Sequence, residues 1–170
     1  MKTGEINYNV IRSAEETISE LGLTCSSARM VPAGTILMAM YGQGVTRGRV
    51  AVLGIEAAIN QACLAISPTS HITAQFLYHF LAYRYDAIRD MGHGANQKNL
   101  NAAMVKSTPV PMPSDTEQAF IARVLSGADR KIAKELDARS SLEVLHTAML
   151  HALVAGRVRI PVHQASEGGR

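Results

Sequence analysis

The chain has 170 residues, of which 47% are hydrophobic and 18% charged, and its formal net charge is +3. These proportions are ordinary for a folded globular protein and exclude extensive disorder. The length favours one sizeable core with an appendage rather than two full domains. Charge is unevenly distributed: residues 6–20 are acidic, whereas basic residues predominate from 29 to 106, where the carboxylates are Glu56, Asp86 and Asp90.

The sequence also indicates a cellular compartment. The first ten residues contain no apolar stretch typical of a secretory signal. The uncharged range 57–83 is long enough to span a bilayer, but its polar residues argue against a membrane helix. Cys25 and Cys63 have no metal-ligand spacing, and we interpret both as buried thiols of a reducing compartment. We therefore expect a soluble cytoplasmic protein with no membrane partner.

Glycines and prolines mark the expected elements of the first two thirds of the chain. A short helix is predicted from Ser13 to Gly22. Two strands, 34–41 and 49–55, should flank the loop that begins at Met40. Residues 57–68 read as one further buried strand, in which Asn60 and Gln61 are expected to be buried and hydrogen-bonded. Helical spacing then predicts a helix from Thr73 to Gly92.

A segment with alternating prolines, 107–118, is predicted to be extended and to precede a long helix. Ser114 or Asp115 is suited to cap this helix, which should continue to about Gly156, with a possible break at 139–141. Its apolar positions recur at spacings of three and four, which indicates a seam for a second helix. The expected seam residues are Ile121, Leu125, Ile132, Leu136, Leu142, Leu145, Met149 and Leu153.

These elements predict an α+β protein. A globular domain with mixed strands and short helices would occupy residues 1–113. The long helix would occupy 114–157 and form a coiled coil with a partner, and 158–170 would be a tail. The partner is expected to be another copy or another subunit, because about 60 Å of helix exceeds what a domain of this size can cover.

The sequence contains none of the usual catalytic constellations. The glycine-rich stretch 42–49 lacks the spacing and the lysine of a phosphate-binding loop. The histidines form no zinc-protease motif, and His146 and His151 are five residues apart, which does not suit a shared metal on a helix. Neither a GxSxG elbow nor a base partner for Cys63 is evident. We therefore expect no metal, no cofactor and no catalysis by this chain alone.

Two polar stretches instead carry the residue types that contact DNA. Arg, Lys, Asn and Gln bind phosphates and read base edges. The candidates are Gln43, Thr46, Arg47, Arg49, Asn96, Gln97, Lys98 and Asn99. Each has an alternative: the glycines near Arg47 and Arg49 suit a tight strand connection equally well, the two arginines could be surface ion-pair partners, and Asn96 and Gln97 could serve the fold.

Several motifs in this order resemble the specificity subunits of type I restriction-modification enzymes. They are "TGEI" at 3–6, the range 16–66, "GHGANQKNLN" at 92–101, and "PVPMPSDTEQAFIARVL" at 109–125. The last is "LEVLHTAMLHALVAGRVRI" at 142–160. In that family a Gly-Asn-Gln loop precedes an alternating-proline strand and an E-Q-x-x-I helix start, and the helix closes with a Gly-basic-hydrophobic tail. The matching residues are Gly94, Asn96, Gln97, Pro109, Pro111, Pro113, Glu117, Gln118, Ile121, Gly156, Arg157 and Val158.

The resemblance implies a non-catalytic subunit that reads double-stranded DNA and carries methyltransferase subunits, while other chains methylate and cleave. The family usually has two recognition domains and two long helices that pair in antiparallel fashion. This sequence has one of each and begins near "TGEI", so it resembles a half-subunit with an N-terminally short recognition domain. We expect it to pair with itself or with another specificity chain and to read a bipartite target. The alternative is a truncated remnant that acts only through its long helix.

Overall fold

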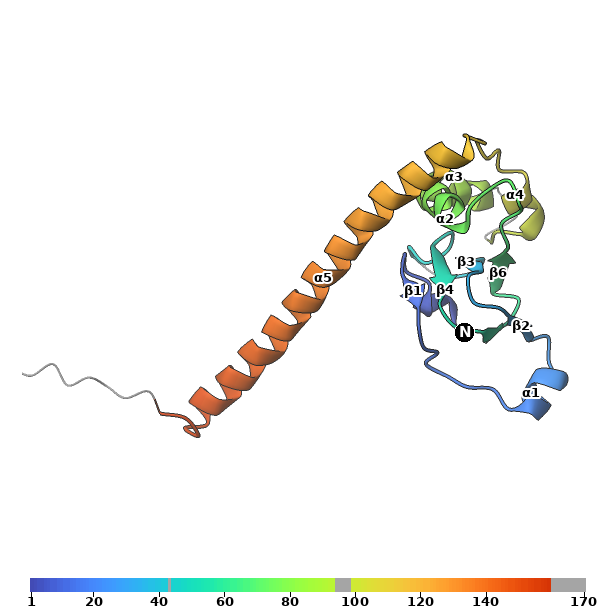
Figure 1. Ribbon diagram of the computed structural model, residues 1–170. Coiled ribbons are helices and arrows are strands. Elements are labelled where there is room, and N and C mark those ends of the chain that lie inside the picture. The colour runs from blue at the N-terminus through green and yellow to red at the C-terminus, as the bar shows by residue number, and fades with distance from the viewer. Residues whose placement is uncertain (43, 94–98, 160–170) are drawn as a thin grey trace, which may run out of the picture. The chain divides into compact units, whose positions relative to one another are not determined.

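The computed structural model describes residues 1–42, 44–93 and 99–159 (Figure 1). Two compact units are present, one from Met1 to Ser126 and one from Gly127 onward. The boundary between them lies inside the long helix α5 (Asp115–Val154). The first turns of α5 thus belong to the globular unit, and the rest of the helix belongs to the second unit. The predicted α+β class, with mixed strands, short helices and a long C-terminal helix, is confirmed.

A four-stranded sheet forms the centre of the first unit. Its strand order is β1 (Val10–Ile11), β4 (Val50–Leu53), β3 (Ile36–Ala39) and β6 (Cys63–Ile66). Strand β3 is antiparallel to both β4 and β6, whereas β1 runs parallel to β4. The two strands predicted on either side of the glycine-rich loop are therefore β3 and β4, and they pair with each other.

Strand β3 is buried on both faces, so the two faces divide the core. Ile36 and Met38 belong to a cluster with helices α2 (Ala74–Tyr83), α3 (Tyr85–Asp90) and α4 (Ala102–Lys106). The neighbouring side chains, Leu37 and Ala39, belong to a second cluster on the opposite face, as expected from the alternation of side chains along a strand. Figure 1 shows α2, α3 and α4 gathered on one side of the strands.

The second face is covered by N-terminal residues and a two-stranded antiparallel sheet. This sheet pairs β2 (Arg29–Val31) with β5 (Ala57–Ile59), and the buried Ile6 and Ile59 pack in the same cluster as Leu37. Single turns of 3-10 helix, η1 (Thr3–Glu5) and η2 (Met91–His93), complete the unit.

The helix predicted at 13–22 is displaced. Helix α1 spans Glu20–Thr24, and Ser19 is its N-cap, whose Oγ atom accepts the Gly22 amide at 3.1 Å. The acidic residues that suggested a first helical turn have other partners in a non-helical segment. The Glu15 amide donates to a Glu5 carboxylate oxygen at 3.0 Å, and Glu16 forms an ion pair with Lys2.

Two long elements of the prediction are each divided in the structure. Residues 57–68 form β5 and β6 with a turn between them, and the Oδ1 atom of Asn60 stabilises this turn by accepting the Ala62 amide at 3.0 Å. Asn60 and Gln61 are exposed, so the expectation that they are buried was wrong, although both are hydrogen-bonded. Helix 73–92 is likewise interrupted at Arg84, between α2 and α3.

The two thiols differ in their surroundings. Cys63 is buried at the start of β6, and burial raises the pKa of its thiol. Cys25 follows α1 and is exposed, so its predicted burial was wrong. The cause is the displacement of α1: the short helix lies in a long connection and buries none of its own residues.

Helix α5 begins with a reciprocal cap. The Glu117 amide donates to Ser114 Oγ at 3.4 Å, and the Ser114 amide and hydroxyl donate to Glu117 Oε2 at 3.0 and 2.7 Å. This arrangement is a capping box, and Ser114 is thus the one of the two suggested caps that caps the helix. Two hydrogen bonds from Ser114 hold the pKa of the Glu117 carboxyl below its ordinary value. The bond from the hydroxyl has the larger effect and the bond from the backbone amide the smaller.

The same helix is continuous to Val154, so the possible break at 139–141 is absent. Ser141 is accommodated because its hydroxyl donates to the Asp137 carbonyl at 2.9 Å. At the C-terminal end, Gly156 has φ +66°, and the amides of Gly156 and Arg157 donate to the carbonyls of Leu153 and Ala152. These two hydrogen bonds form a Schellman motif. The Gly-basic-hydrophobic tail therefore ends the helix.

Candidate nucleic-acid interface

Three connections meet at one end of the central sheet. Strand β3 ends there and β4 and β6 begin there, because β3 is antiparallel to both. The connections are the β3–β4 loop, the β5–β6 turn and the segment before α4. Backbone hydrogen bonds join them: the Met40 amide donates to the Ala62 carbonyl at 2.9 Å, and the Leu100 amide donates to the Met40 carbonyl at 3.3 Å. The sheet thus brings together polar segments that are distant in sequence.

The glycines of the β3–β4 loop have conformational reasons to be glycine. Gly42, Gly44 and Gly48 all have positive φ angles. A Cβ atom on Gly42 would lie 2.8 Å from the Cβ of Thr46, which is too close for any other residue. Both readings of the loop were left open by the sequence. The structure supports the conformational one for the glycines.

Tyr85, the first residue of α3, contacts the β3–β4 loop and holds it in position. Its hydroxyl donates to the Val45 carbonyl at 2.6 Å and accepts from Arg89 Nη1 at 2.8 Å. The ring lies 3.6 Å from where a Gly48 Cβ would be, so a side chain at Gly48 would press on it. The position of the loop therefore depends on an aromatic side chain of a neighbouring helix.

Tyr8 connects this arrangement to the N-terminal segment. The Tyr8 ring meets the Tyr85 ring edge-on, with the ring centroids 6.0 Å apart. The guanidinium carbon of Arg49 lies 5.8 Å from the centroid of the Tyr8 ring. Arg49 also donates to Asn7 Oδ1 at 2.6 Å. Burial raises the pKa of the Tyr8 hydroxyl, as does Tyr85, while the Arg49 cation lowers it. The backbone of Tyr8 has φ 54°, a strained conformation that is often found at functional sites.

The predicted DNA-contacting residues have different surroundings. Arg49 and Thr46 are half-buried in the β3–β4 loop, and Asn99 is exposed. Arg47 is only 9% exposed, and its guanidinium carbon would lie 3.5 Å from a Cβ on Gly92. Burial makes Arg47 a support between this loop and the segment at Gly92 rather than an open contact. The other candidates, Gln43, Asn96, Gln97 and Lys98, lie outside the described residues.

The structure adds residues to this end of the sheet that the sequence did not indicate as DNA contacts. Arg29, Tyr41, Asn60 and Gln61 are exposed and line one hollow of about 390 Å³. Asn60 and Gln61 were misjudged because their segment was read as one strand. Polar residues in the middle of an apolar run were the signal for a turn between two strands.

Neither a metal site nor a membrane segment is found in the part of the chain that the structure describes. Within it, no group of three or more His, Cys, Asp or Glu side chains could hold a metal ion. Among the same residues, no helix combines the length and the apolar character needed to cross a bilayer.

The expected helix seam divides between the two units. Ile121 is partly buried and packs against the core of the globular unit, and Leu125 near the end of that unit is 40% exposed. In the second unit the remaining seam residues are exposed. These are Ile132, Leu136, Leu142, Leu145, Met149 and Leu153, with exposed fractions from 40% to 65%.

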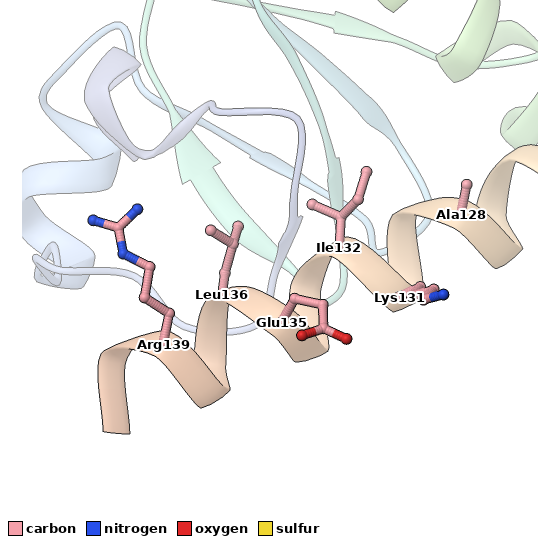
Figure 2. Close-up of a pocket in the computed structure, with 6 residues that line it drawn as sticks. All are labelled: Ala128, Lys131, Ile132, Glu135, Leu136 and Arg139. Carbon is pink, nitrogen blue, oxygen red and sulfur yellow. The ribbon is translucent and has the colours of Figure 1, made fainter. Parts of the chain in front are cut away.

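Figure 2 shows Ala128, Ile132 and Leu136 projecting from the same side of α5, one turn apart. They line a shallow hollow whose other walls are Lys131, Glu135 and Arg139. Apolar side chains in a row with charged neighbours are typical of a helix that packs against a second helix.

Comparison with known proteins decides the family. Residues 2–143 match the family model described as "Type I restriction modification DNA specificity domain". The chain belongs to this family. The resemblance seen in the sequence motifs is thus confirmed.

Two curated relatives are specificity subunits. The chain is 28% identical over 138 residues to the type I restriction enzyme MjaIX specificity subunit of Methanocaldococcus jannaschii, an alignment that covers 80% of this chain and 31% of the relative. It is 23% identical over 128 residues to the EcoR124I/EcoR124II specificity subunit of Escherichia coli, covering 74% and 32%. The matched region of this type I specificity chain thus corresponds to about a third of each relative.

Solved structures show the same fold. A chain from a study of complex assembly and conformational transition in a type I R-M system superposes with a TM-score of 0.59 at 16% identity, covering 75% of this chain and 31% of that one. The HsdS subunit from Thermoanaerobacter tengcongensis superposes with a TM-score of 0.51 at 18% identity, covering 72% and 30%.

Proposed function

We propose that this chain is a DNA-recognition half-unit of a type I restriction-modification system. The observation that carries the proposal is the match of residues 2–143 to a DNA specificity domain. The polar end of the central sheet supplies a surface suited to that role. Half-buried Arg49 and exposed Arg29 and Asn99 offer donors to phosphates and base edges, and Tyr85 fixes the loop that carries Arg49.

The second part of the proposal concerns α5. Its exposed row of apolar side chains pairs with a second long helix, either from another copy or from another specificity chain. The free energy of burying such residues, about 25 cal/mol per Å² of apolar surface, favours this pairing in water. Two paired half-units then read two half-sites at a fixed separation, because a two-fold assembly presents one reader per arm.

The paired helices would also carry the methyltransferase subunits, so that recognition of DNA positions the subunit that modifies it. No cofactor is assigned to the chain itself, and the proposed role is that of a cytoplasmic protein. The competing hypothesis, a remnant that acts only through its helix, draws on the same exposed seam but leaves the polar sheet end without a role.

Binding to DNA as a function of salt concentration tests the proposal. We expect the purified chain to bind duplex DNA with an affinity that falls steeply as salt rises, with a log–log slope of about 0.9 per phosphate contacted. Arg49→Ala should reduce that slope by about one. A chain that self-associates normally but shows no binding at low salt would instead support the helix-only alternative.

A further inference from the structure

A hollow of about 390 Å³ lies at the polar end of the sheet, beside the β3–β4 loop. Its polar lining comes from strand β2 and three connections: Arg29 from the start of β2, Tyr41 after β3, Asn60 and Gln61 from the β5–β6 turn, and Asn101 before α4. No Asp or Glu is among its lining residues. The apolar floor includes the buried side chains of Met40, Cys63 and Leu100.

The three amide side chains of the hollow use their oxygen atoms within the chain. Asn60 Oδ1 accepts the Ala62 amide at 3.0 Å, Gln61 Oε1 accepts the Ser27 hydroxyl at 2.9 Å, and Asn101 Oδ1 accepts the Met104 amide at 2.9 Å as the N-cap of α4. A carboxamide whose oxygen is engaged presents its NH2 group as a donor.

Arg29 adds a guanidinium, which has N–H donors and no acceptor. Arg29 is exposed and lies opposite Ile59 in the β2–β5 pair. Ile59 immediately precedes the turn that carries Asn60 and Gln61. The side chains of Arg29, Asn60 and Gln61 therefore offer donors together in a hollow that has no carboxylate among its described lining residues. A ligand group that pairs with these three side chains carries acceptors side by side.

DNA contains two such groups. In the major groove guanine is the base whose edge presents two acceptors, O6 and N7, whereas the edge of adenine combines an acceptor with a donor. A backbone phosphate also presents adjacent acceptor oxygens. Because the hollow and the β3–β4 loop lie at the same end of the sheet, one duplex can contact both.

We propose that the hollow lined by Arg29, Asn60 and Gln61 binds an acceptor-only group of the DNA, either the O6/N7 edge of a guanine or a backbone phosphate. This assignment rests on the proposed DNA-binding function and adds a second contact to it. Gln61 is held in place by Ser27, so its NH2 group is oriented before DNA binds, which reduces the entropic cost of the contact.

The test compares full-length wild-type chain with Gln61→Glu and Arg29→Gln. In Gln61→Glu the donor becomes a negatively charged acceptor, while an oxygen remains to accept from Ser27. Gln75→Glu is the matched control, because Gln75 is an exposed residue of α2 that does not line the hollow. Thermal unfolding of each variant establishes that it is folded, and Arg29→Gln provides a second route if Gln61→Glu is unstable.

The probes are duplexes recovered by wild-type chain from a random pool, resynthesised with 7-deazaguanine at single positions or with single methylphosphonate linkages. If a guanine edge is bound, one 7-deazaguanine position weakens wild-type binding by about fivefold to a hundredfold, as expected for loss of a specific base contact. Gln61→Glu then binds weakly, and its affinity is the same for the guanine and the 7-deazaguanine duplex. Gln75→Glu still binds the guanine duplex more tightly. If a phosphate is bound, one methylphosphonate linkage has this effect instead.

Two negative results have separate meanings. Wild-type affinity and unchanged base preference in both folded variants would overturn the assignment of the hollow and leave the proposed function intact. Absence of any wild-type binding at low salt would overturn the proposed function and, with it, this assignment.

Discussion

Gln118 accepts the backbone amide of Thr73 at 2.9 Å through Oε1, although the two residues are separated by 45 positions in the chain. Its Nε2 atom donates to the carbonyls of His71 at 2.9 Å and Pro113 at 3.0 Å, and its side chain is 0% exposed. One buried amide thus joins the proline segment, the first turn of α5 and the residues that precede α2. The E-Q-x-x-I motif is explained residue by residue: Glu117 caps, Gln118 bridges and Ile121 packs in the core.

Replacing Gln118 by alanine should destabilise the globular unit by about 3 kcal/mol, because buried polar groups of the backbone lose their partners. Urea unfolding followed by far-UV circular dichroism measures this change. Gln75→Ala, which removes an exposed glutamine from α2, is the matched control and should have little effect. Equal stability of the two variants would show that the bridge contributes nothing.

The Ser114–Glu117 cap predicts a dependence on pH. Because the folded-state pKa of Glu117 is lowered, its ionised form stabilises the fold above the unfolded-state pKa. This contribution is lost as pH falls through the folded-state pKa. Ser114→Ala should raise the pKa of Glu117 toward its ordinary value, as measured by NMR titration of the carboxyl carbon. A pKa that does not move would mean that Ser114 is not its cause.

The Tyr85 hydroxyl should control the β3–β4 loop. Tyr85→Phe keeps the ring beside Gly48 and removes the hydrogen bond to the Val45 carbonyl. We expect hydrogen exchange of the backbone amides of residues 44–49 to quicken, and DNA affinity to fall several-fold, since the loss of one hydrogen bond amounts to about 1 kcal/mol. Tyr83→Phe, at an exposed tyrosine of α2, is the control. Unchanged exchange in the loop would contradict this role for Tyr85.

The exposed row on α5 predicts self-association or association with another specificity chain. Leu136→Asp places a charge in this row and should lower the sedimentation mass of the assembly, while the globular unit stays folded. Val144→Asp makes a similar substitution at another exposed position of the helix, outside the predicted seam, and should leave assembly intact. If Leu136→Asp sediments like wild type, the seam does not mediate assembly.

The sequence predicts elements well where local signals are strong. The glycine-bounded apolar runs are β3 and β4, the Ser114 cap starts α5, and Gly156 ends it. These features depend on residues that are close together in the chain, so spacing and residue type suffice to find them. The family motifs add the order of the elements, and the family itself is confirmed.

The sequence-based interpretation and the structure differ where tertiary contacts decide the surroundings of a residue. The spacing of apolar residues along a helix does not indicate which surface covers each of them. Ile121 was therefore assigned to a partner helix, although it packs against the globular unit of its own chain. Arg47 has the residue type of a DNA contact but is buried beside Gly92. Gln61 was expected inside a strand, and it lies instead in an exposed turn beside the hollow. In each case the sheet or a neighbouring helix fixes the surroundings of the side chain.

Selection from a random pool of DNA duplexes, with sequencing of those retained at low and moderate salt, tests the central claim most directly. If the chain is a paired half-unit that reads DNA, the retained duplexes will share two half-sites at a constant separation, and Leu136→Asp will abolish the requirement for the second. If the chain still assembles through α5 but retains no duplex at low salt, DNA recognition is contradicted. The alternative, a protein that acts only through its long helix, would then hold.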